Sequence, residues 1–179
     1  MPAILLDGRA LAQRVLADLA PRVQALKADG VVPRLMVVRV GEDPASKVYI
    51  RAKIRACEQA GVLGDELELP ASTSQSAVLE CLDRLNCDAS VHGILVQLPL
   101  PKSLDPHTVA AHIAPAKDVD GLHSCNLGRL VQDDAILPPC TPAGVLRLLD
   151  AYDITLRGKH AVVVGRSEIV GKPMALMLM

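Results

Sequence analysis

The chain has 179 residues, half of them hydrophobic, and its 19 basic and 20 acidic residues leave a formal net charge of −1. A chain of this length can bury a core, and it corresponds to one domain or to one domain and part of another. The two signs of charge are interspersed, so the sequence offers no basic stripe for nucleic acid and no polybasic patch for a membrane. A small molecule is therefore the favoured partner.

The start of the chain and its cysteines indicate the compartment. Asp7 and Arg9 interrupt the first apolar run, which argues against a secretory signal and against a membrane span. The five cysteines contain no Cys-x-x-Cys pair, so we expect neither a disulfide framework nor a zinc site, but reduced and mostly buried thiols. The five histidines lack the spacing of metal ligands, and we expect them in structural or surface roles. These features predict a soluble, cytoplasmic protein.

The first two elements follow from hydrophobic spacing. Apolar residues at helical intervals predict a helix over residues 8–28, which Gly30 ends. Pro21 falls inside this helix, so we expect a kink or break near Ala20. The β-branched run at residues 34–40 predicts a strand.

The next helix has a start and a stop signal. Asp43 is placed to cap it, Pro44 suits its first position, and Gly61 follows its expected end at about Ala60. The alternation then continues to the end of the chain. We predict strands at residues 66–69, 92–97 and 160–164, and helices at 74–85, 106–113 and 142–152.

Strands that alternate with helices indicate an α/β protein with a parallel sheet covered on both faces. In such sheets ligands bind beyond the carboxyl ends of the strands. We therefore expect the functional residues in three segments that follow predicted strands. They are GEDPASKVYIRAK (41–53), QLPLPKS (97–103) and GRSEIVGKP (165–173).

In the first of these segments, Ser46, Tyr49 and Lys53 recur at intervals of three and four residues, which aligns them on one stripe of a helix. One interpretation is a solvated basic face with Tyr49 packed under its neighbours. The other is a site in which Tyr49 stacks on a planar ligand and a partly desolvated Lys53 serves as acid or base. The spacing leaves both open.

In the second segment an apolar strand runs directly into Gln97, and the prolines that follow prevent the strand from continuing. A buried glutamine without partners would cost about 1 to 3 kcal/mol. Gln97 could bond to nearby backbone, or it could hold the amine of Lys53 across the strand ends.

Residues 114–141 show no periodic pattern and are expected to form a long structureless connection, which in a compact domain is usually functional or disordered. The apolar residues within it argue against disorder. Asp118 and Asp120 inside it could be turn residues or an acidic pair. A metal site is disfavoured because no third ligand stands at suitable spacing. The sharper alternative is one aspartate aimed at an amidine-like or guanidine-like edge of a ligand.

The third segment places Gly165, Arg166, Ser167 and Gly171 between a predicted strand and an apolar helix. It is not the Gly-x-Gly-x-x-Gly fingerprint, but the strand, turn and helix amino terminus suit a phosphate. Arg166 could meet the 2′-phosphate that separates NADP from NAD.

Taken together, these motifs resemble the bifunctional methylenetetrahydrofolate dehydrogenase/methenyltetrahydrofolate cyclohydrolase family, the FolD type. The resemblance covers the whole chain, and its motifs are long and stand in family order. They are LDGRALAQ, VGEDPASKVYIRAKIRACEQAG, VHGILVQLPLP, PAKDVDGLHSCNLGRL, PPCTPAGVLRLL and VVVGRSEIVGKPM.

The resemblance implies a role for each candidate residue. Lys53 would be the catalytic lysine, Tyr49 would stack on the folate, and Ser46 would lie close to the lysine. Gln97 would position and tune Lys53, while Pro99 and Asp120 would contact the substrate, Asp120 by holding the pterin ring. The cofactor NADP would contact Gly165, Arg166 and Ser167, and no metal is implied.

The resemblance also implies the architecture and the reaction. A parallel three-layer αβα catalytic domain, residues 1–120, would bind folate, and residues 121–179 would begin a Rossmann-like NADP-binding domain. The family oxidises 5,10-methylenetetrahydrofolate with NADP and hydrolyses the product to 10-formyltetrahydrofolate, a part of one-carbon metabolism that supplies purine biosynthesis. A cytoplasmic homodimer is implied as well.

The family's nucleotide domain continues well beyond the motif at residue 165. We therefore expect a truncated enzyme whose NADP binding and dehydrogenase step are weak or lost while the folate side remains. Two alternatives stay open: a non-catalytic folate-binding or dimerising fragment, and a short-chain dehydrogenase, which also carries Tyr-x-x-x-Lys. In short-chain dehydrogenases, however, the glycine loop precedes that pair, whereas here it follows.

Overall fold

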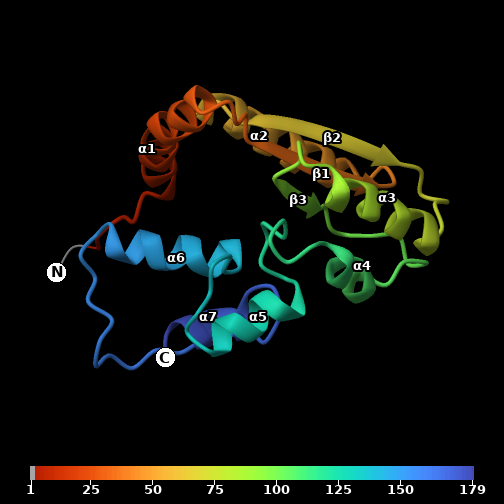
Figure 1. The fold of residues 1–179 in the computed structure, drawn as a ribbon. Coiled ribbons are helices and arrows are strands. Elements are labelled where there is room, and N and C mark those ends of the chain that lie inside the picture. Colours follow the sequence, from red (N-terminus) through yellow and green to blue (C-terminus); the bar gives the residue numbers. More distant parts are fainter. Residues whose placement is uncertain (1–2) are drawn as a thin grey trace. The chain divides into compact units, whose positions relative to one another are not determined.

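The computed structural model describes residues 3–179, and Figure 1 shows the order of its elements along the chain. Helices and strands alternate up to β3, and helices alone follow. The elements are α1 (Gly8–Ala28), β1 (Arg34–Val40), α2 (Pro44–Ala60), β2 (Leu63–Leu69), α3 (Gln75–Cys87), β3 (Gly93–Val96), α4 (Pro106–His112), α5 (Ser124–Val131), α6 (Cys140–Asp150) and α7 (Gly171–Met177).

The chain divides into two compact units. The sheet unit consists of Leu16–Val119 and holds all three strands. The helical unit combines the described residues up to Val15 with Asp120–Met179. The division runs through α1, between Val15 and Leu16.

The sheet unit contains a three-stranded parallel sheet in the order β2-β1-β3. The central strand β1 is buried along most of its length, as the β-branched sequence predicts. Strand β2 begins at Leu63 and not at residue 66, because Leu63 to Asp65 already pair with the start of β1. The prediction of an α/β fold with a parallel sheet is confirmed.

Helices cover both faces of this sheet (Figure 1). Successive side chains along β1 point to opposite faces of the sheet, so neighbouring residues belong to different apolar clusters. Met36 and Val38 pack with residues of α3 and α4, whereas Val37 packs with Ile50 of α2. The predicted three-layer αβα arrangement is therefore confirmed for the sheet unit.

Helix α2 begins and ends where its sequence signals predict. The Asp43 side chain accepts a hydrogen bond from the backbone N–H of Ser46 at 2.9 Å, and Pro44 occupies the first turn. Gly61 ends the helix in the left-handed conformation, with φ of 79°. Of the kink or break expected near Ala20 of α1, the break does not occur, because that helix runs without interruption through Pro21.

A short segment before residue 120 extends the sheet. The N–H of Ile94 donates to the oxygen of Lys117 at 2.7 Å, and Ile94 and Asp118 form a parallel bridge. Val119 packs so close to Gly93 that a Cβ at Gly93 would stand 2.5 Å from the Val119 Cγ1 atom. The beginning of the expected long connection is thus part of the sheet unit's structure.

The rest of that connection is not structureless, which corrects the prediction for residues 114–141. Helix α5 lies inside it and is capped by the His123 side chain, which accepts from the N–H of Cys125 at 3.0 Å. Histidine is not among the residues that usually signal a helix start, and an eight-residue helix shows little periodicity. Helix α6 begins at Cys140, two residues before its predicted start.

The strand predicted at residues 160–164 does not form. Val162 and Val164 are 74% and 97% exposed, and no segment within residues 3–179 pairs with theirs. A strand exists only where a neighbour takes its backbone hydrogen bonds, and β-branched composition does not supply that neighbour. In this unit α7 packs against α5 and α6 instead.

The five cysteines are all free, as predicted, but the expectation that they are mostly buried is wrong. Cys81 is buried and Cys57 half-buried, whereas Cys87, Cys125 and Cys140 are exposed. Each exposed thiol stands at the end or in the first turn of a helix, where burial is incomplete. Among residues 3–179, no helix combines the length and the apolar character needed to cross a membrane.

Candidate functional site

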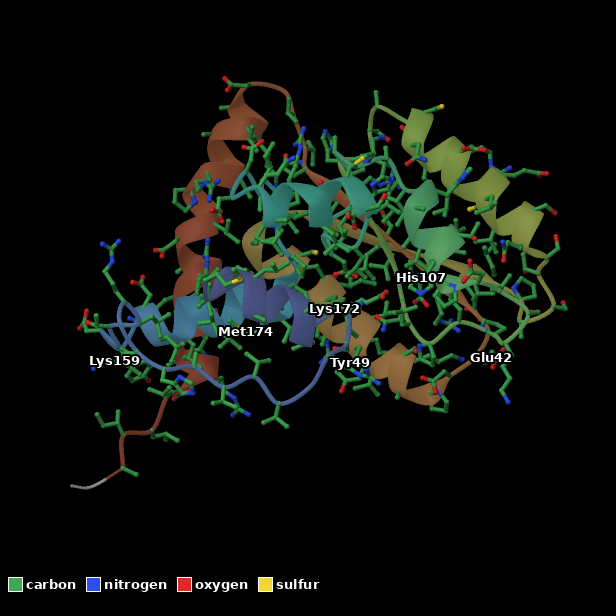
Figure 2. The ribbon with its side chains drawn as sticks, turned by 90° about the horizontal axis from the view of Figure 1, so that it is seen from below. Glu42, Tyr49, His107, Lys159, Lys172 and Met174 are labelled. Carbon is green, nitrogen blue, oxygen red and sulfur yellow. The ribbon has the colours of Figure 1, made fainter. Side chains whose placement is uncertain are left out.

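Helix α2 presents the three aligned residues at very different depths. Ser46 is 2% exposed, Lys53 is half-buried, and Tyr49 is 63% exposed. Figure 2 labels Tyr49 on this helix. The interpretation in which Tyr49 packs under its neighbours is therefore wrong, and its ring is open to a planar ligand.

The amine of Lys53 meets the amide of Gln97. The Lys53 Nζ atom donates to the Gln97 Oε1 atom at 3.0 Å, across 44 residues of sequence. Gln97 directly follows β3, which lies beside β1 in the sheet. Helix α2 packs against one face of these two strands. Both side chains are half-buried, so the pair is sheltered but reachable.

The Gln97 side chain bonds to backbone as well as to lysine. Its Nε2 atom donates to the backbone oxygen of Leu98 at 2.8 Å. A carbonyl only accepts hydrogen bonds, so this contact turns the amide nitrogen toward Leu98 and the amide oxygen toward Lys53. The two alternatives for Gln97 are realised together.

The same carbonyl links the site to the cap of α2. The hydroxyl of Ser46 lies 3.4 Å from the Leu98 oxygen and 2.9 Å from the Asp43 Oδ2 atom. The N–H and hydroxyl of Ser46 lower the pKa of Asp43, because both donate to its charged form. The sequence marks Asp43 only as a helix cap and carries no signal for the Leu98 carbonyl.

Chemically, this arrangement offers an amine held by a neutral amide, beside an exposed aromatic ring. Such a set can take up or deliver a proton and can stack on a flat ligand. Among residues 3–179, no group of three or more His, Cys, Asp or Glu side chains could hold a metal ion. Every buried side-chain nitrogen or oxygen among these residues also has a hydrogen-bond partner.

The other predicted substrate contacts differ in placement. Pro99 is exposed and follows a cis peptide bond from Leu98. Asp120 is half-buried and begins the second stretch of the helical unit. Asp118 is 2% exposed and bridges to Ile94, so it is an interior residue.

The glycine loop lies in the helical unit, where Gly165, Arg166 and Ser167 are exposed. Gly165 has a φ of +130°, which favours glycine, and a Cβ on Gly171 would stand 2.5 Å from its oxygen. The Ser167 Oγ atom accepts from the N–H of Val170 and that of Gly171, each at 3.2 Å. Figure 2 labels Lys172 and Met174 on the helix that follows.

The model of the tetrahydrofolate dehydrogenase/cyclohydrolase catalytic domain matches residues 6–120, which is more than half of the chain. The chain belongs to this family. The model of the family's NAD(P)-binding domain matches residues 139–179. Membership in the tetrahydrofolate dehydrogenase/cyclohydrolase family confirms the resemblance and replaces the alternative of a short-chain dehydrogenase.

Curated members of the family are similar over nearly the whole chain. Bifunctional protein FolD 3 of Ectopseudomonas mendocina is 54% identical over 178 residues, and bifunctional protein FolD of Bordetella avium is 53% identical over 179. These alignments take in 99% and 100% of the chain but 58% and 63% of the relatives. The chain thus spans about three fifths of the length of these family members.

Solved structures of the family share the fold. The bifunctional enzyme FolD of Campylobacter jejuni is 44% identical with a TM-score of 0.96, covering 98% of this chain and 62% of that one. The Trypanosoma brucei enzyme, solved with NADP cofactor and an inhibitor, is 36% identical with a TM-score of 0.94. That comparison covers 99% of this chain and 62% of the other.

Proposed function

We propose that this chain carries the folate site of a bifunctional enzyme of one-carbon metabolism. The activities are oxidation of 5,10-methylenetetrahydrofolate to the 5,10-methenyl cation with NADP, and hydrolysis of that cation to 10-formyltetrahydrofolate. Family membership supports the reaction class. The observation that carries the proposal is the hydrogen bond between Lys53 Nζ and Gln97 Oε1.

The hydrolytic step needs proton transfer and no metal. Water attacks the cationic carbon, a C–O bond forms, and one proton is released to a base. The C–N bond then breaks as the second proton passes from the new hydroxyl to the nitrogen. The amine of Lys53 would take up the first proton, and positioned proton transfer of this kind contributes about 10²- to 10⁴-fold in rate.

The surrounding residues would orient the reactants. Tyr49 would stack on the pterin with its exposed ring, and Gln97 would hold the Lys53 amine while its own nitrogen is engaged by Leu98. Ser46 would keep the end of β3 and the start of α2 together. Pro99 and Asp120 would complete the folate site, Asp120 by accepting hydrogen bonds from the amidine-like edge of the ring.

NADP, when bound, would supply the hydride acceptor for the dehydrogenase step. The glycine loop fits a phosphate group, because Gly165 and Gly171 let two stretches of backbone approach and Arg166 is charged and exposed. We propose that residues 1–120 form the folate-binding catalytic domain. Residues 121–179 would begin the Rossmann-like NADP-binding domain, with Gly165, Arg166 and Ser167 as its cofactor contacts.

The test follows the disappearance of the methenyl chromophore, corrected for the spontaneous reaction. Lys53→Met should lower the rate by about 10²- to 10⁴-fold, while tetrahydrofolate binding stays within a few fold. Lys47→Met is the matched control, since Lys47 stands on the same helix and pairs only weakly with Glu42 at 3.4 Å. A Lys53→Met variant as fast as a wild type that turns over would refute the catalytic role of Lys53. A wild type without turnover would leave the alternative of a non-catalytic folate-binding or dimerising fragment.

The homodimer implied by the resemblance stays a prediction. Light scattering of the purified protein should give twice the mass of one chain, and a monomeric mass would contradict it. The cytoplasmic location and the absence of nucleic acid and membrane partners are likewise predictions, tested by fractionating cells that produce the protein.

A further inference from the structure

The ammonium group of Lys117 is bound entirely by backbone. Its Nζ atom donates to the oxygens of Leu85, Asn86 and Asp88, at 3.0, 2.8 and 2.7 Å. These carbonyls stand at the carboxyl end of α3, where helix carbonyls lack partners and the helix dipole favours a positive charge. An ammonium has three N–H bonds, so all the donors of Lys117 are used.

Asn86 of α3 also forms hydrogen bonds to the chain that leads from α4 to Lys117. The Nδ2 atom of Asn86 donates to the oxygen of His112, and its Oδ1 atom accepts from the N–H of Ala114, both at 2.8 Å. Asn86 therefore fixes the chain shortly before Lys117, and Lys117 fixes it again. The segment between α4 and residue 118 is thus hydrogen-bonded to the carboxyl end of α3 near both of its own ends.

The backbone of Lys117 connects this anchor to the sheet. Its oxygen accepts from the N–H of Ile94 at 2.7 Å, and the neighbouring Asp118 forms the parallel bridge. Ile94 precedes Gln97 by three residues, and Asp118 precedes Asp120 by two. The packing of Val119 against Gly93 then seats the last residue before Asp120.

We propose that Lys117 and Asn86 are positioning residues for Asp120. They act through the backbone, because Lys117 has no N–H left for a ligand and both polar atoms of the Asn86 amide are engaged. By fixing residues 117–119 against α3 and β3, they set the point from which Asp120 reaches the pterin ring. The inference rests on the proposed function, in which Asp120 contacts the folate.

A lysine suits this position for a geometric reason. Its three donors diverge from one compact charge and can meet three carbonyls that surround it. A guanidinium is planar, so Lys117→Arg should restore part of the anchor, whereas Lys117→Met keeps the length of the side chain and removes every donor. Comparing the two variants separates the effect of the Lys117 hydrogen bonds from the effect of packing by its aliphatic side chain.

The experiment measures methenyl hydrolysis in the intact protein. Lys117→Met should raise KM for 5,10-methenyltetrahydrofolate about tenfold and change kcat less than twofold, since the Lys53–Gln97 pair is untouched; Lys117→Arg should recover part of the KM. Ser74→Ala is the matched control. It weakens α3 from its other end, where the Ser74 hydroxyl caps the helix, without touching residues 114–120.

The outcomes separate this inference from the proposed function. If Lys117→Met and Ser74→Ala lower the melting temperature alike and both leave KM unchanged, Lys117 is only a helix cap and the inference is overturned. If the wild type lacks turnover, the proposed function fails. Calorimetric titration with tetrahydrofolate then decides the inference: about tenfold weaker binding by Lys117→Met supports it, and equal or absent binding by both proteins overturns it.

Discussion

The amide of Gln97 has one orientation because its nitrogen donates to the Leu98 oxygen at 2.8 Å. Its oxygen is left to face Lys53, whose Nζ atom lies 3.0 Å away. An amide oxygen accepts a hydrogen bond from a protonated and from a neutral amine alike. Under the proposed function, Gln97 would therefore hold Lys53 in place throughout proton transfer, which a charged partner would not do.

The substitution Gln97→Glu tests whether the partner of Lys53 must be uncharged. A carboxylate cannot donate to the Leu98 oxygen, so the contact that turns the amide oxygen toward Lys53 is lost, and a charge replaces the neutral partner. We expect hydrolysis to fall about 10- to 100-fold at neutral pH. Steady-state rates check this, and an unchanged rate would show that the amide does not act on Lys53.

Asp43→Asn should change the acid stability of the protein. The pKa of Asp43 is lowered in the folded state, chiefly by the backbone N–H of Ser46 and then by its hydroxyl. The stabilisation is therefore present above the ordinary aspartate pKa and is lost as the pH falls below about 4, where the unfolded state binds more protons.

Urea unfolding at pH values from 3 to 7 measures the effect. Asp43→Asn should unfold at lower urea at pH 7, and its loss of stability toward pH 3 should be shallower than in the wild type. Asp18→Asn is the control, since Asp18 has no comparable contact with any residue from 3 to 179. Parallel acid limbs for Asp43→Asn and wild type would contradict the assignment.

Arg39 is a buried charge that needs its partners. Its side chain is 4% exposed on β1 and bonds Glu66 and Glu68 of β2 at 2.6 and 2.7 Å. The hydrogen bond to Glu66, ahead of the other contributions, raises the pKa of Arg39 despite its burial.

Glu66→Gln with Glu68→Gln should lower the free energy of unfolding by roughly 2 to 4 kcal/mol. The double change leaves the buried guanidinium without an opposite charge, although the partial exposure of both carboxylates reduces the effect. Chemical denaturation measures it. Glu42→Gln, whose side chain is 78% exposed, should stay within about 0.5 kcal/mol of wild type, and an equal loss in both variants would argue against the buried pair.

The 179-residue chain should bind NADP more weakly than micromolar. Residues 160–164 form no strand in the structure, Val164 is 97% exposed, and the Ser167 hydroxyl already occupies two N–H groups of the glycine loop. Titration calorimetry with NADP checks this, with Arg166→Met as the comparison. Micromolar binding that Arg166→Met abolishes would contradict the prediction.

Local signals were enough for most of the fold. The cap at Asp43, Pro44 in the first turn and Gly61 at the end predict α2 to the residue, because these groups satisfy backbone atoms only a few positions away. The β-branched run of β1 and the alternation of strands with helices predict the parallel sheet for the same reason.

The predictions that were wrong concern elements that depend on distant partners or on unusual caps. Residues 160–164 have the composition of a strand, but composition cannot provide the neighbour that a ladder requires. Helix α5 is preceded by an unusual cap, His123, and Leu130 is buried by packing that no local pattern predicts. The uninterrupted α1 shows that one missing N–H, at Pro21, did not end a long helix.

For the site, the sequence by itself determined the stripe of Ser46, Tyr49 and Lys53 and the placement of Gln97 at a strand end, since both depend on the period of one element. Only the tertiary structure decided that Lys53 and Gln97 meet, and which end of the amide faces the amine. Residues 44 positions apart come together because β3 lies beside β1 under α2, and that adjacency arises from packing across the whole sheet.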